Sequence, residues 1–289
     1  MHGIFGVFFI FLMVFGGFLI AGGTLDIILI SLPVEMMIIC GAAFGAFLIS
    51  NDRAIIIQTF QDSTKIFRGA KWADQDYQDL LCLLFEIIRM SRQNPIEIDD
   101  HIDAPYESKI FTRYPKILAD AEATNLICDT LRSATMNYDD PHQVEELLDN
   151  RMQTHLQQAL QSSRALQQVA EGLPALGIVA AVLGVIKTMG SIDQPPEILG
   201  RMIGSALVGT FLGVFLSYGL VGPFATKLKA LMRQEAHFYQ LIRQVLITNL
   251  HNHSTTICIE VGRQNTPQIY RPSFAVLESA LKELKVSLA

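Results

Sequence analysis

The sequence predicts an all-α membrane protein with four transmembrane helices and long cytoplasmic helical extensions. Half of the 289 residues are hydrophobic and only 17% are charged, whereas about 25% of the residues in soluble domains are charged. The apolar residues gather in four long runs, two near the N-terminus and two after residue 171. The net charge of −6 argues against a nucleic-acid-binding protein, which usually carries a basic patch.

The first two runs form a pair at the N-terminus. Residues 3–23 are long enough to cross a bilayer, which takes about 20 apolar residues. No lysine or arginine precedes this run, as a signal peptide would require, so we expect a retained first span. A loop over 24–33 then leads to a second span over 34–51, which places Glu35 near the outer end of that span. Residues 1–51 form the first predicted domain.

The third and fourth runs form a second pair, which makes residues 172–222 another predicted domain. The two spans are expected over 172–189 and 202–222, with a loop over 190–201 between them. Close helix contact in lipid needs small residues, and these spans are rich in them: Ala175, Gly177, Ala180, Ala181, Gly184, Gly204, Ala206, Gly209 and Gly213. The first span is bulkier, so we expect it to form an outer layer around an inner layer of the third and fourth spans. Packing within one chain could use the same small residues.

Two polar segments, 52–171 and 223–289, are predicted to be cytoplasmic domains. They contain all but Lys187 and Arg201 of the 22 lysines and arginines, and basic residues close to the spans stay on the cytoplasmic side. Both chain termini are therefore expected inside, and the two short loops outside.

The polar segments are predicted to be helical. Apolar side chains recur at three- and four-residue spacing between Val144 and Leu160, so we expect one helix to run from Pro141 without a break into the third span. The fourth span is expected to continue as a helix over 225–250, and a further helix is expected over 271–281.

The sequence predicts no catalytic residue, no metal site and no cofactor. The four cysteines, and the pair His251 and His253, lack the spacing of a metal or redox site. The four runs also lack a buried acid, histidine or arginine at mid-depth, which an ion path normally needs. Either the chain conducts nothing, or a partner chain supplies the carboxylate. Thr210 is the conspicuous mid-span hydroxyl, although such a group can simply bond back to its own helix.

Two further patterns each allow two interpretations. Pro174, at the edge of the third run, removes a backbone donor, so it marks either a hinge or a plain helix boundary. Residues 85–103 are either a solvated face or a docking surface for a charged partner. They carry basic residues followed by acidic ones: Arg89, Arg92, Glu97, Asp99, Asp100 and Asp103.

Six segments, in order along nearly the whole chain, are close to segments of one known family. They are VFGGFLIAGG (14–23), LLCLLFEIIRMSRQ (80–93), YPKILAD (114–120), GLPALGIVAAVLGV (172–185), VGTFLGVFLSYGLVGPFAT (208–226) and RPSF (271–274). With these segments the sequence resembles the MotA family, the ion-channel subunits of the bacterial flagellar stator. The resemblance implies a ring-forming homo-oligomer in the bacterial inner membrane, with five copies around two helices of a MotB-like partner that supplies a membrane aspartate.

The resemblance also implies roles for four membrane residues. Pro174 and Pro223 match family prolines that are tied to coupling ion movement to shape change. Thr210 matches a position near the partner's carboxylate. Ala181 stands where sodium-driven relatives carry a threonine, and the loss of an oxygen ligand favours protons over Na⁺.

A rotor contact is the last implication of the resemblance. In the family, a cytoplasmic arginine and a downstream acid pair with opposite charges on the rotor protein FliG. Arg92 matches the arginine. The acid falls on Asp99 if one residue is deleted within 94–98, and on Asp100 without a gap; the family often has glutamate there.

The favoured interpretation is therefore a non-enzymatic stator subunit that couples proton flow to torque on the rotor. The nearest alternative is a TolQ- or ExbB-like subunit that energises envelope transport, which typically has three spans. A non-conducting membrane scaffold is an alternative of a different class, and a transporter should show its own buried polar site.

Overall fold

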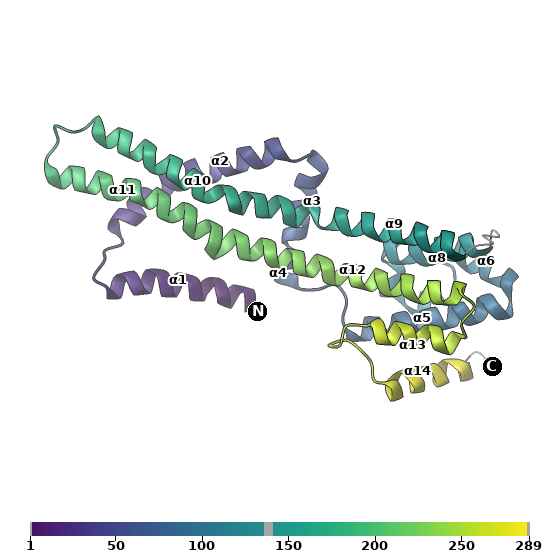
Figure 1. Cartoon of the computed structure of the whole chain (residues 1–289). Helices are drawn as coiled ribbons and strands as arrows, with labels where there is room; N and C mark the ends of the chain where they lie inside the picture. Colours follow the sequence, from purple (N-terminus) through teal and green to yellow (C-terminus); the bar gives the residue numbers. More distant parts are fainter. Residues whose placement is uncertain (1, 136–140, 288–289) are drawn as a thin grey trace. The chain divides into compact units, whose positions relative to one another are not determined.

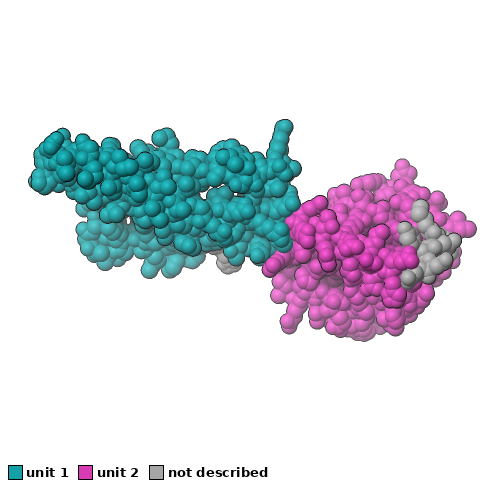
Figure 2. Space-filling model, turned by 45° about the horizontal axis from the view of Figure 1, so that its top comes forward, with its two compact units in different colours: residues 1–69, 159–232 teal, residues 70–158, 233–289 magenta. Residues whose placement is uncertain are grey.

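The computed structural model describes residues 2–135 and 141–287, and every regular element that it describes is a helix. The chain divides into two compact units (Figure 2). The first, called here the membrane unit, comprises residues 1–69 and 159–232. The second, called the polar unit, comprises residues 70–158 and 233–289. The prediction of four functional domains concerns roles along the chain and stays a prediction.

The membrane unit confirms the expected four membrane-spanning helices. Its helices are α1 (His2–Ile20), α2 (Asp26–Ser50), α3 (Arg53–Ser63), α4 (Lys65–Arg68), α10 (Gln161–Met189) and α11 (Pro196–Phe215), followed by a π-helical segment, η2 (Leu216–Val221). The helix α12 (Gly222–Leu250) begins in this unit and continues into the polar unit. Four helical stretches are long and apolar enough to cross a bilayer: Gly3–Ile20, Asp26–Ser50, Pro141–Met189 and Pro196–Leu250.

The core of the membrane unit lies between α2, α10 and α11, which all contact one another (Figure 1). Its buried side chains include Ile39 from α2, Leu173 from α10 and Leu212 from α11. Helix α1 has no buried residue in its apolar stretch, and Phe5 and Phe8 are exposed. This exposed apolar surface suits contact with lipid.

The structure corrects the expected start of the second span. Helix α2 begins at Asp26, with Pro33 inside it, whereas the sequence predicts a loop over 24–33. The turn after α1 is short and includes Gly22, whose φ of 83° favours glycine. Proline is tolerated inside a membrane helix where neighbouring groups satisfy the freed backbone atoms, so Pro33 does not end the helix.

Two smaller boundary predictions also change. The expected unbroken helix from Pro141 is two helices, because α9 (Pro141–Ala159) ends one residue before Leu160 and α10 begins after it. The loop between α10 and α11 covers 190–195 instead of 190–201, because Pro195 and Pro196 lie at the start of α11. The continuation of the fourth span to Leu250 is confirmed.

The polar unit is built around α5 (Asp74–Gln93), a helix with a long buried face. The other elements are α6 (Pro95–Asp103), η1 (Phe111–Arg113), α7 (Pro115–Leu118), α8 (Ala121–Thr135), α9, the rest of α12, α13 (Thr255–Asn265) and α14 (Phe274–Ser287). Helices α6, α13 and α14 contact α5. Trp72 and Phe238 stack in the core, with ring centroids 3.8 Å apart.

The segment YPKILAD is part of this scaffold. The Tyr114 hydroxyl donates to Glu86 Oε1 at 2.8 Å, and burial together with this bond raises the pKa of Tyr114. Lys116 pairs with Asp76. Asp120 accepts bonds from the Ala123 N–H at 2.7 Å and from the Tyr239 hydroxyl at 3.0 Å. These buried polar contacts stabilise the polar unit, because a buried polar group without a partner is costly.

Candidate functional site

Helices α10 and α11 touch through their backbones at several glycines, among them Gly177, Gly209 and Gly213. A Cβ atom added to Gly177 would lie 2.8 Å from the Gly209 carbonyl oxygen and 2.9 Å from Gly213 Cα. One added to Gly213 would lie 2.7 Å from the Leu173 carbonyl oxygen. These small residues therefore serve packing within one chain, the alternative that the sequence left open, and they hold the two helices at a fixed register.

This contact brings Ala181 and Thr210 to the same level of the helix pair. A Cβ atom at Gly209, next to Thr210, would lie 3.2 Å from the Ala181 backbone nitrogen. Ala181 and Thr210 are both half-buried. Among the residues that the structure describes, none accepts a hydrogen bond from the Thr210 hydroxyl. The hydroxyl is thus available to a group outside this chain.

The two prolines flank the transition from membrane helix to polar helix. Pro174 lies inside α10 and is half-buried. Pro223 is the second residue of α12, directly after the π-helical segment η2, and is exposed. The structure therefore places both prolines within continuous helical stretches, where each removes a backbone donor.

Glu35 is a buried acid whose position differs from the expected one. The expectation that the four runs lack a mid-depth acid is wrong, because α2 begins at Asp26 and Glu35 therefore lies well inside the helix. Glu35 is 6% exposed, and its Oε2 atom has no hydrogen-bond partner among the residues that the structure describes. Oε2 lies 2.6 Å from the place that a Cβ on Gly209 would occupy. A cavity of about 390 Å³ adjoins it and is also lined by Lys187, Thr188 and Ser205.

The charged residues expected at the rotor differ in how they are held. Arg92 is exposed, but its guanidinium donates to Asn249 Oδ1 at 2.6 and 3.1 Å and to the His253 carbonyl. Asp99 and Asp100 are exposed on α6. Within the described residues, neither carboxylate forms an ion pair, and neither contacts Arg92 through a hydrogen bond.

Comparison with known proteins decides what these helices belong to. Residues 4–95 match the family described as Motility protein A N-terminal, and residues 119–240 match the MotA/TolQ/ExbB proton channel family. Motility protein A of Escherichia coli (strain K12) is 37% identical over 273 residues, which cover 94% of this chain and 92% of the relative. The chain belongs to the motility protein A family. It is accordingly a multi-pass membrane subunit of the flagellar stator and a channel protein, not an enzyme.

Further relatives agree with this assignment. Chemotaxis protein LafT of Vibrio parahaemolyticus is 33% identical and covers 96% of this chain and 97% of its own. Two solved structures share the fold: MotAB of C. jejuni at a TM-score of 0.72, 17% identity, 94% coverage of this chain and 98% of its own, and the flagellar MotAB stator complex of Bacillus subtilis at 0.69, 21% and 98% of both chains. The match of residues 4–95 to the N-terminal family of motility protein A excludes a TolQ- or ExbB-like subunit.

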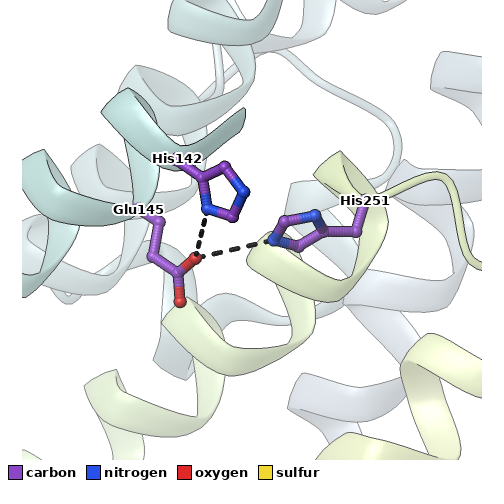
Figure 3. Close-up of side chains that lie close together, drawn as sticks. All are labelled: His142, Glu145 and His251. Carbon is purple, nitrogen blue, oxygen red and sulfur yellow. Dashed lines mark ion pairs between the residues drawn. The ribbon is translucent and has the colours of Figure 1, made fainter. Parts of the chain in front are cut away.

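One cluster of possible metal ligands in this MotA-family chain was missed by sequence reasoning. His142 and Glu145 on α9 meet His251, which follows α12 (Figure 3). Glu145 Oε2 lies 3.8 Å from His142 Nδ1 and 3.5 Å from His251 Nε2. Arg243 lies 3.6 Å from the other oxygen of this carboxylate, and its positive charge competes with any cation there. The cluster is an ion-pair group, and His253 takes no part in it.

Proposed function

We propose that this stator subunit assembles with a MotB-like partner and couples inward proton movement to torque on the rotor. The two solved structures compared above are structures of MotAB and of a MotAB stator complex. The partner would supply the membrane carboxylate, and five copies of this chain would surround two partner helices in the bacterial inner membrane. The distribution of lysine and arginine supports cytoplasmic termini and a cytoplasmic polar unit.

The observation that carries the ion path is the free hydroxyl of Thr210 beside Ala181. The glycine contact of α10 and α11 fixes both residues at one level, and the Thr210 hydroxyl bonds to no described residue. A hydroxyl in this position can donate to a carboxylate or accept from a proton carrier. Because Ala181 offers no side-chain oxygen, the site lacks a ligand that Na⁺ would need.

The prolines are proposed to convert the ion step into a change of helix direction. Pro174 and Pro223 each remove a helical hydrogen bond at the base of a membrane helix, and bends in helices occur at such positions. Pro174→Leu restores the donor and should leave assembly intact but stop rotation, as measured by swimming and by co-purification with the partner. Normal swimming of this variant would remove the role in coupling.

The rotor surface is proposed to lie on the polar unit at α5 and α6. Asp99 and Asp100 are exposed and form no ion pair with any described residue, so they can meet positive charges on FliG. Arg92 is exposed as well, although its bonds to Asn249 and His253 fix its orientation. The buried Ile98 and Ile102 hold α6 in place between the exposed acids.

Ion flux through the assembled complex tests the proposal. The chain would be co-expressed with a MotB-like partner whose plug segment is deleted, and internal pH and sodium would be followed separately. Acidification that needs both chains and ignores sodium is expected. The matched variants are Thr210→Ala, which removes the hydroxyl and should reduce the flux, and Ala175→Ser, which adds a hydroxyl on an exposed face of α10 and should not.

The other outcomes of this experiment contradict defined parts of the proposal. Sodium entry without acidification would keep the stator role and overturn the assignment of the ion. No flux from a verified complex in the membrane would favour the non-conducting scaffold.

A further inference from the structure

Pro174 leaves a carbonyl oxygen without its helical donor. In an α-helix the N–H of residue 174 would bond to the carbonyl of Ala170, but proline has no N–H. Ala170 is 2% exposed, and a buried carbonyl without a partner is costly, most of all at a membrane. The carbonyl must therefore find a donor elsewhere.

The donor comes from η2, the π-helical segment that follows α11. The hydroxyl of Ser217 donates to the Ala170 carbonyl at 2.6 Å, across 47 positions of sequence. Ser217 is itself 2% exposed, so water does not compete for this bond. The serine hydroxyl thus takes the place of the backbone N–H that Pro174 lacks.

Ser217 also lies in the helical turn directly before Pro223. It lies in the π-helical segment η2, and its carbonyl accepts a bond from the N–H of Gly222, the residue before Pro223. A π-helical turn shifts the bonding by one residue, which accommodates a following proline that cannot donate. A Cβ at Gly222 would lie 2.9 Å from the Ser217 carbonyl oxygen and 4.0 Å from Ala170 Cβ, so glycine keeps this region tightly packed.

We propose that Ser217 is a positioning residue that joins the two proline sites into one hinge. Its hydroxyl donates to the Ala170 carbonyl, which Pro174 leaves without a helical donor. Its own carbonyl accepts from the N–H of Gly222, the residue before Pro223. Because of this double attachment, a bend of α10 at Pro174 has to move η2, or else break the bond and leave the Ala170 carbonyl unpaired. The consequence for torque rests on the proposed coupling function, whereas the replacement of the missing N–H does not.

A double-mutant cycle in the full complex with its partner tests the hydrogen bond. Ser217→Ala should lower the Tm by about 3 °C, because it leaves a buried carbonyl unsatisfied. Pro174→Ala supplies a new N–H for the Ala170 carbonyl, so adding Ser217→Ala to it should change the Tm by less than about 1 °C. Equal falls of the Tm in both backgrounds would overturn the proposal.

Ser163 provides the matched control. It is a buried serine in α10, the helix that contains Pro174, and its hydroxyl donates to the Leu160 carbonyl within one turn. Ser163→Ala should shift the Tm equally with and without Pro174→Ala. A background-dependent shift at Ser163 would mean that Pro174→Ala disturbs the whole helix, and would overturn the assignment of the coupling to Ser217.

Torque and flux then separate the hinge from the channel. Ser217→Ala should keep proton flux through the unplugged complex within about twofold while the stall torque falls severalfold. If the stall torque of Ser217→Ala is unchanged although the Tm shifts of the cycle are non-additive, the joint hinge is overturned. The hydrogen bond between Ser217 and Ala170 would then still stand. Absence of flux already in the unmodified complex would contradict the proposed function and leave the Tm cycle interpretable.

Discussion

Gly177→Ala should separate α10 from α11 by a measurable amount. The new Cβ would lie 2.8 Å from the Gly209 carbonyl oxygen and 2.9 Å from Gly213 Cα, whereas ordinary contact begins at 3.4 Å. The helices must therefore move apart by about 0.5 Å at a place where backbone meets backbone. Such overpacking costs about 1–3 kcal/mol, partly offset by about 0.5–1 kcal/mol from replacing a helical glycine with alanine.

Gly172→Ala is the control that isolates the packing cost. It lies on the same helix, and a Cβ there meets no atom within 4 Å. The gain in helix propensity is the same for both variants, so the difference between them, about 1–3 kcal/mol, measures the clash alone. Thermal unfolding of the purified complex should give Gly177→Ala the lower Tm, by at least about 3 °C. Equal Tm values would refute the close backbone contact.

Three further predictions follow from buried or exposed charge. Glu35→Gln should leave assembly and Tm intact, because within the described residues Oε2 has no hydrogen bond to lose; loss of the complex on size-exclusion chromatography would contradict this. The fall in stall torque caused by Asp99→Lys should exceed the difference in stall torque between Arg92→Glu and Arg92→Ala. The charge of Arg92 is expected to matter less because its guanidinium is already bonded to Asn249. The reverse order would make Arg92 the main rotor contact. Burial raises the pKa of Tyr77 to about 12, so between pH 10 and 12 the unfolded chain loses this proton first and stability falls; Tyr77→Phe should reduce the alkaline fall in Tm, and an unchanged fall would contradict it.

The membrane helices could be predicted because their signal is local. Each span is a long apolar run, and length and hydropathy alone identify it. The expected loop over 24–33 left Pro33 outside the second span, whereas α2 begins at Asp26 and continues through this proline. That error also moved Glu35 to the end of the span. Proline predicts a helix boundary well in water and poorly in a membrane protein, where neighbouring groups satisfy the freed backbone atoms.

The candidate site could be predicted only in part. The roles of Pro174, Ala181, Thr210 and Pro223 rest on the resemblance to the family, and the structure adds the geometry that surrounds them. The sequence could not show that the Thr210 hydroxyl has no acceptor among the described residues, nor that Arg92 bonds to Asn249. Both properties depend on contacts between distant segments. The ligand cluster at His142 was missed for the same reason, since His251 is 109 positions away in the chain.

The irregular positions of α10 and α11 occur in complementary pairs. Gly177 on one helix faces Gly213 on the other, and the donor missing at Pro174 is replaced by the hydroxyl of Ser217. In water a solvent molecule could donate to the Ala170 carbonyl, so one helix could change without the other. At a membrane the missing donor must be replaced by a protein group. An irregularity in one helix therefore depends on a residue of its neighbour. A bend at one proline would therefore move both helices, which is what the proposed coupling of an ion step near Thr210 to the polar unit requires.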